Sequence, residues 1–163
     1  VYLALLLASP YILIELFRFI TPALYDNERK YSARITCTIF LLFITGVLMS
    51  YFVIFPFSIR FLGTYQVSED VVNMINLSSY ISTFTALTFM MGIVFQIPVI
   101  SFFLAKMGIL EAEFMARYRR QALIIIMIIA AIITPPDIFT LVLVTIPMYA
   151  LYELSILIVK RIN

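Results

Sequence analysis

The sequence predicts an all-α integral membrane protein, and its composition and the extent of its apolar runs both indicate this fold class. Hydrophobic residues make up 64% of the 163-residue chain and charged residues only 12%, about half the charged fraction usual in soluble domains. The mean hydropathy is +1.10. Apolar residues are spread along the whole chain, so a soluble core could not bury them all. Each run within the bilayer should be helical, because lipid offers no backbone hydrogen-bond partner and strand-like alternation is absent.

Five apolar runs predict five transmembrane helices, which we expect to form a single transmembrane domain over residues 1–163. The second run would extend about 34 Å at 1.5 Å per residue, enough to cross a hydrocarbon core of about 30 Å. The fourth would reach only about 20 Å. Pro147 and Glu153 interrupt the fifth, so the last two helices are predicted to be short. The runs cover residues 1–19, 35–57, 79–104, 122–134 and 138–159.

The turn at residues 135–137 (Pro-Pro-Asp) joins the last two runs. Two short helices joined in this way would thin the bilayer locally or be shielded by partner helices. Alternatively, they form a purely structural hairpin whose arginines extend their charged ends to the membrane surface. The sequence leaves both interpretations open.

Basic residues gather at alternate junctions between the runs, which orients the helices. The positive-inside rule places these junctions in the cytoplasm, with the first visible residue on the outer side and the C-terminus cytoplasmic. Only Arg60 lies at a junction of the other set. Because the chain starts with Val1 inside an apolar run, we expect a missing N-terminal span. The basic residues on the cytoplasmic set are Arg18, Arg29, Lys30, Arg34, Lys106, Arg117, Arg119, Arg120, Lys160 and Arg161.

The first of these cytoplasmic junctions also carries two carboxylates, Asp26 and Glu28, among its basic residues. Loops on the basic side of a membrane protein are marked by their excess of Lys and Arg. A carboxylate can accept charge-assisted hydrogen bonds from a cationic group. The acidic pair is therefore a candidate docking point for a cationic ligand.

Few polar side chains lie within the runs. Glu15 is three residues before Arg18, a spacing that predicts a local ion pair. Gln96 lies near the middle of the third run, where it would bond to an adjacent helix or line a polar groove. Pro98 should kink the helix just beyond Gln96. Glu153 lies in the last run, within reach of the cytoplasmic interface.

The chain lacks the residues and motifs of common catalytic sites, so we expect no enzyme activity, cofactor or metal. It has no His, which removes most metal sites and the Ser/His/Asp triads. Hydrolase, metalloprotease and nucleotide-binding motifs are missing, and nothing indicates a nucleic-acid partner. A small-solute secondary transporter is the main alternative to a receptor, because transporters use broken helices with polar groups in mid-span. Against it, intramembrane charges are few and no inverted repeat is visible.

Several motifs resemble, in order, those of the TatC family, the multispanning receptor subunit of the twin-arginine protein translocase. The resemblance covers essentially the whole chain. It implies a six-span fold with both ends cytoplasmic, of which this chain would contain the second to sixth helices. The motifs that carry it are FRFITPALY at 17–25 with ERK at 28–30, YFVIFP at 51–56, FQIPV at 95–99, MGI at 107–109, TPPD at 134–137 and IPMYALYE at 146–153.

This resemblance implies a function in protein transport across the bacterial cytoplasmic (inner) membrane. Family members bind the twin-Arg signal peptides of folded proteins. They form the translocase core with TatA/TatB-type single-span partners in an oligomeric complex, driven by the proton-motive force. The residue matching Glu28 helps bind the arginine pair, and Phe19 occupies the matching aromatic position.

Four further positions are assigned through the same resemblance. Asp137 matches an acidic residue associated with function, although helix N-capping explains it equally well. Many relatives carry Glu in place of Gln96. Thr134 is retained in the cluster that docks a partner helix, whereas Leu141 replaces a polar residue there. Together with Glu153, these residues are the candidate functional positions outside the signal-peptide site.

Overall fold

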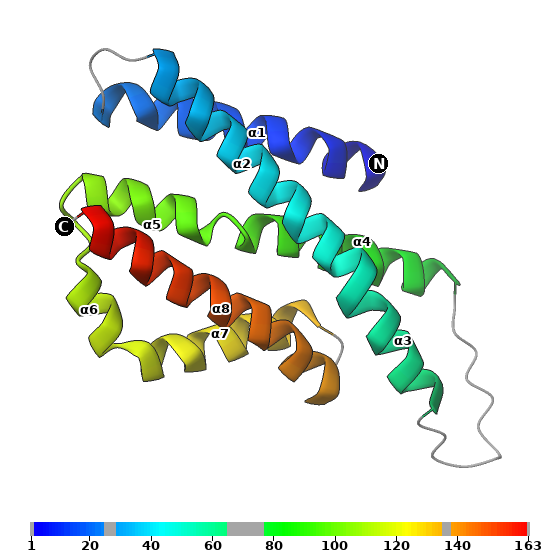
Figure 1. Ribbon diagram of the computed structural model, residues 1–163. Helices are drawn as coiled ribbons and strands as arrows, with labels where there is room; N and C mark the ends of the chain where they lie inside the picture. Colours follow the sequence, from blue (N-terminus) through cyan, green and yellow to red (C-terminus); the bar gives the residue numbers. More distant parts are fainter. Residues whose placement is uncertain (1, 25–28, 65–76, 135–137, 163) are drawn as a thin grey trace.

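The computed structural model describes residues 2–24, 29–64, 77–134 and 138–162. Within these ranges every regular element is a helix, so the all-α prediction is confirmed (Figure 1). The elements are α1 (Tyr2–Leu24), α2 (Arg29–Met49), the π-helical segment η1 (Ser50–Ile54), α3 (Phe55–Thr64), α4 (Leu77–Val94), α5 (Ile97–Lys106), α6 (Ala112–Arg117), α7 (Arg119–Ile133) and α8 (Ile138–Ile162). Four of the nine described segments, η1, α3, α5 and α6, are parts of longer spans or connections.

The α4–α5 pair runs through the middle of the molecule, with α1 and α2 on one side and α7 and α8 on the other (Figure 1). The end of α1, the start of α2, the α5–α6 connection and the end of α8 lie at one end of the molecule, and the ends of α3 and α7 and the starts of α4 and α8 lie at the other. Lys106 ends α5, Arg119 begins α7, and Lys160 and Arg161 occupy the last turn of α8. We call this end, which also holds the start of α2, the basic end.

Three continuous helices are long and apolar enough to cross a membrane among the described residues: Ala33–Arg60, Ile81–Lys106 and Ile138–Ile162. The first combines α2, η1 and α3, and the second combines α4 and α5. The fourth predicted run forms α7, whose 15 residues extend about 22 Å. This helix is short, as expected.

The last helix is longer than predicted, because Pro147 and Glu153 do not interrupt it. α8 continues for 25 residues with Pro147 inside it. Proline removes a single backbone donor, and neighbouring groups in a helical membrane protein can compensate for that loss. Pro147 is buried in the packed bundle, and Glu153 forms an ion pair with Arg119 at 3.0 Å. α8 therefore accommodates both residues without ending.

The third predicted run bends where Pro98 was expected to kink it. α4 ends at Val94 and α5 begins at Ile97, with the Gln96 N–H donating to the Ile93 carbonyl at 2.9 Å. Proline suits the first turn of a helix because its missing N–H has no intrahelical partner there. At the other end of α5, Gly108 has φ of 73°, the left-handed conformation that terminates helices and that glycine adopts without strain.

α2 and α4 cross in close contact through small residues. A Cβ atom built on Gly46 would lie 3.1 Å from the Gly92 Cα, and one built on Gly92 would lie 2.5 Å from the Phe43 ring. One turn further along, at the start of η1, the hydroxyl of Ser50 lies 3.3 Å from that of Thr88 on α4. Small residues let helix backbones approach closely in membranes, where packing and interhelical hydrogen bonds drive association.

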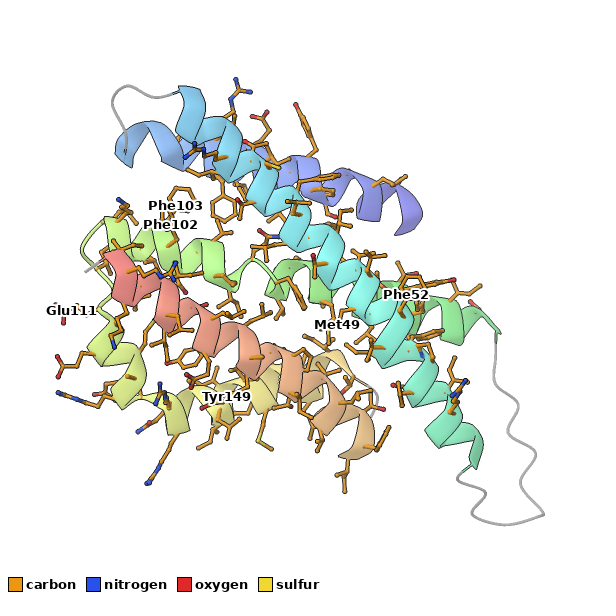
Figure 2. The ribbon with its side chains drawn as sticks, in the orientation of Figure 1. Met49, Phe52, Phe102, Phe103, Glu111 and Tyr149 are labelled. Carbon is orange, nitrogen blue, oxygen red and sulfur yellow. The ribbon has the colours of Figure 1, made fainter. Side chains whose placement is uncertain are left out.

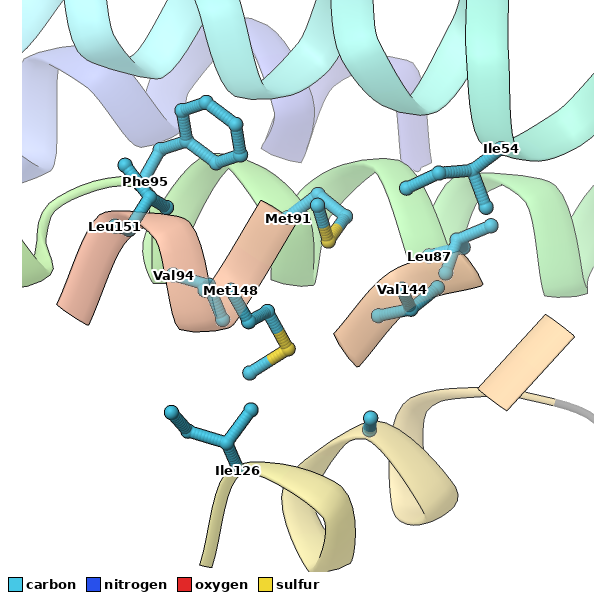
Figure 3. Packing of buried hydrophobic residues seen from close by; sticks show 10 residues of the cluster. Ile54, Leu87, Met91, Val94, Phe95, Ile126, Val144, Met148 and Leu151 are labelled. Carbon is cyan, nitrogen blue, oxygen red and sulfur yellow. The ribbon is translucent and has the colours of Figure 1, made fainter. Parts of the chain in front are cut away.

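The main hydrophobic core lies where α4 meets α7 and α8. Figure 3 shows Met91 and Met148 at its centre, with Ile126 approaching from α7. Flexible methionine side chains fill irregular gaps between helices well. A second cluster joins α1 and α2 to α5, where Phe17 stacks on Phe103 with ring centroids 5.2 Å apart. The buried members of the main core are Ile54, Leu87, Met91, Val94, Phe95, Ile126, Ala130, Val144, Met148 and Leu151.

Candidate functional site

The end of α1 presents Phe19 to its surroundings. Its side chain is 86% exposed, whereas Phe17, two residues earlier, is buried against Phe103. Residues two apart on a helix point to nearly opposite faces, so anchoring Phe17 turns Phe19 outward. The predicted ion pair also forms here, with Arg18 Nη1 3.7 Å from Glu15 Oε1. The C-terminal part of α1 thus offers an exposed aromatic surface beside a neutralised ion pair.

Glu28, the predicted arginine-binding carboxylate, lies outside the described residues, as does Asp137. Glu28 directly precedes Arg29, the first residue of α2. Phe19 lies five residues before the end of α1 at Leu24. Phe19 therefore lies near the end of α1 at the basic end of the molecule, and Glu28 follows it by nine positions in the sequence.

Gln96 joins two helices at the break between α4 and α5. It is 1% exposed, and its Nε2 donates a hydrogen bond of 3.1 Å to the Ile39 carbonyl on α2. This confirms the expected bond to an adjacent helix. Its Oε1 has no hydrogen-bond partner within the described part of the chain, which leaves one acceptor of this buried amide unmet.

Glu153 is the centre of a polar cluster that joins α7 to α8. Arg119 Nε lies 3.0 Å from Glu153 Oε1, and Arg119 Nη2 lies 3.1 Å from Oε2, so the pair is bidentate. The Tyr149 hydroxyl donates to Oε1 at 3.0 Å (Figure 2). One turn nearer the basic end, the Tyr152 hydroxyl donates to the Met115 carbonyl at 2.8 Å. These bonds fix the corner formed by α6 and α7 against α8.

The two predicted partner-docking residues, Thr134 and Leu141, face the protein interior. Thr134 is buried and its hydroxyl donates to the Ala130 carbonyl at 2.8 Å. Leu141 is partly buried and packs against the main core. The exposed apolar surface near them belongs instead to α7, which buries only Ile126 and Ala130. Its most exposed large side chains are Ile124, Ile125, Ile128 and Ile132.

Sequence reasoning missed two polar links between distant helices. Arg119 and Glu153 are 34 positions apart, and Thr140 donates to the Ser58 hydroxyl at 3.3 Å across 82 positions. Neither spacing leaves a periodic signal in the sequence.

Long apolar helices, interhelical bonds between their few polar groups, and cations collected at one end define a multispanning helical membrane protein. Residues 1–147 match the sequence model of one such family, described as "Sec-independent protein translocase protein (TatC)". The chain therefore belongs to the TatC family.

Curated relatives from three bacteria support this assignment. A TatC protein of Blattabacterium sp. subsp. Periplaneta americana is 43% identical over 151 residues, covering 93% of this chain and 57% of the relative. TatCy of Bacillus subtilis is 38% identical, covering 97% and 62%. TatC of Helicobacter pylori strain J99 is 39% identical, covering 98% and 64%. The chain thus spans less than two thirds of the length of these three relatives.

Two crystal structures of a twin arginine translocase receptor, TatC, have the same fold. One superposes with a TM-score of 0.86 at 34% identity, covering 99% of this chain and 71% of the other. The second, determined in the detergent DDM, gives a TM-score of 0.84 at 35% identity and covers 96% and 69%. The chain accordingly shares the fold of these TatC structures over nearly its whole length.

Proposed function

We propose that this protein binds the twin-Arg signal peptides of folded cargo and forms the translocase core with TatA/TatB-type single-span partners, driven by the proton-motive force. The observation that carries the proposal is the exposed Phe19 on α1, followed within one family motif by Glu28. A large aromatic side chain exposed to 86% gains nothing from the fold of this chain. A ligand bound at this end of α1 would cover the ring.

The chemistry at this position suits an arginine pair. The Glu28 carboxylate would accept two parallel hydrogen bonds from one guanidinium. An aromatic ring such as Phe19 favours a guanidinium or an apolar side chain stacked on its face. The Arg18 cation beside it is already paired with Glu15, so it opposes an incoming cation less than a free guanidinium would.

The orientation of the helices favours the same proposal. Cations of α5, α7 and α8 lie at the basic end together with the end of α1 and the start of α2. The positive-inside rule places that end in the cytoplasm, where folded cargo and its signal peptide would arrive. We therefore infer that the protein lies in the bacterial cytoplasmic membrane with its C-terminus inside and the first visible residue outside.

The remaining candidate positions have different roles in this proposal. Gln96 and Glu153 hold helices together, through the bonds to Ile39 and Arg119. Thr134 and Leu141 would act from behind α7, by fixing the helix to which a partner docks. Asp137 stays a prediction of a functional acid or N-cap.

Crosslinking to a synthetic twin-Arg signal peptide tests the receptor role. Glu28→Ala and Glu28→Arg should abolish crosslinking in membranes, while the protein stays inserted and folded. Glu113→Ala is the matched control, because Glu113 is an exposed carboxylate at the same end, in a 3.8 Å pair with Arg117. Undiminished crosslinking and export by both Glu28 variants would refute the role of Glu28. Flux of a small solute through the purified protein alone would favour a transporter instead.

A further inference from the structure

A groove of about 440 Å³ lies between α2, α5 and α8. α5 forms its floor, and α2 and α8 form its walls. The lining is apolar apart from Arg34 and Thr38. The residues that shape it include Ile35 and Leu42 on α2, Val99 and Phe102 on α5, and Leu154 and Ile158 on α8.

Arg34 lines this groove at the basic end, and cations of α5 and α8 lie close to its lining residues. Arg34 lines the groove directly, and no described carboxylate forms an ion pair with it. Lys106 Nζ lies 5.9 Å from the centre of the Phe102 ring, which is labelled on α5 in Figure 2. Arg161 follows Ile158 by three residues and so lies on the same face of α8. The mouth is therefore positive and the interior apolar.

The depth of the groove favours a lipid chain over a transmembrane helix. From Arg34 to Leu42 the α2 wall extends about 12 Å at 1.5 Å per residue. This is less than half of a hydrocarbon core of about 30 Å, so the groove is confined to one leaflet. A spanning partner helix would need a surface that continues across the whole bilayer.

The charge at the mouth selects among the ligands that could enter. A signal peptide with basic residues before its apolar segment would be repelled by three cations. A phosphate group, in contrast, matches the planar guanidinium of Arg34, which can donate two parallel hydrogen bonds. Basic pockets between transmembrane helices at the cytoplasmic surface bind anionic lipid headgroups in this way.

We propose that this groove binds one anionic glycerophospholipid of the leaflet at the basic end. One acyl chain occupies the space between α2 and α8 above Val99 and Phe102, and the phosphate contacts Arg34 at the mouth. Bound there, the lipid fills the gap between α2 and α8.

Native mass spectrometry of the purified, delipidated protein with added lipid measures this binding. Wild type should bind dioleoyl phosphatidylglycerol more tightly than dioleoyl phosphatidylcholine. Arg34→Gln should weaken phosphatidylglycerol binding about fivefold, the effect of one cation at an anionic surface, and leave phosphatidylcholine binding unchanged. Arg120→Gln is the control, because Arg120 is an exposed cation on α7 that does not line this groove.

A second variant tests the apolar part of the site independently of charge. Thr38→Phe places a ring in the groove from an exposed position on α2, so the fold should persist while bound phosphatidylglycerol is lost. Equal affinity of wild type for the two lipids would overturn the proposal. So would equal effects of Arg34→Gln and Arg120→Gln, or unchanged lipid binding by Thr38→Phe. Because no signal peptide is present, the result does not depend on the proposed receptor role.

Discussion

Gln96 shows at the scale of a single residue how this chain uses its few polar side chains. Its amide nitrogen donates to Ile39 on another helix, while its amide oxygen has no partner among the described residues. A buried donor left without a partner would cost about 1–3 kcal/mol. The bond to the Ile39 carbonyl avoids that cost for the amide nitrogen. It also links α2 to the bend between α4 and α5.

The Arg119–Glu153 pair should stabilise the fold measurably. Both side chains are partly exposed, at 49% and 35%, so solvent screens the pair. The bidentate geometry compensates for part of that screening. In a double-mutant cycle with Arg119→Gln and Glu153→Gln, we expect a coupling energy of about 1 kcal/mol, measured by thermal unfolding in detergent.

The chain offers a matched control for this cycle. Arg117 and Glu113 lie 3.8 Å apart with side chains that are 73% and 85% exposed, so their coupling should stay below about 0.5 kcal/mol. Equal coupling energies in the two pairs would show that neither the bidentate geometry nor the hydrogen bond from Tyr149 to Glu153 adds to stability.

Among the helices, close packing where α2 crosses α4 sets the distance between these two helices. A Cβ atom on Gly46 would lie 2.7 Å from the Met91 carbonyl oxygen, and backbone cannot move aside as a flexible side chain can. Alanine is normally favoured over glycine inside a helix by about 1 kcal/mol. At Gly46, steric overlap should reverse that preference.

We expect Gly46→Ala to lower the unfolding free energy by about 1–3 kcal/mol, the usual cost of overpacking. Thr45→Leu is the control. It adds bulk at the preceding position, which is exposed, and should change the unfolding free energy by no more than about 0.5 kcal/mol. Both are measured by unfolding of the purified proteins in the same detergent. A Gly46→Ala variant as stable as wild type would mean that α2 and α4 are free to separate.

Local features of the helices could be predicted from the sequence, but contacts between helices could not. Apolar runs gave the helical class and Pro98 gave the bend, because each acts on its own backbone. Whether Pro147 breaks α8 depends on packing from other elements, and that prediction was wrong. The partner of Glu153 was also missed, since nothing in a linear pattern brings position 119 to position 153.

At the scale of the whole molecule, the helices leave different surfaces exposed on the two sides of α4–α5. The α1–α2 side carries Phe19 and the α1–α2 connection, where we place signal-peptide binding. The opposite side carries α7, which is only 15 residues long and buries a single narrow stripe. Separate surfaces would let a signal peptide and a single-span partner bind at the same time.

Disulfide crosslinking should locate the partner on α7. Ile132 is 77% exposed on α7, and Leu7 is 70% exposed on α1, across α4–α5 from α7 (Figure 1). In a background where the exposed Cys37 is replaced by Ser, Ile132→Cys should crosslink to a cysteine in the membrane helix of a TatA-type partner. Leu7→Cys should give several-fold less product, because α1 lies across α4–α5 from α7. Equal yields from both positions would show that apolar exposure alone explains the contact, and α7 would lose its role as the docking helix.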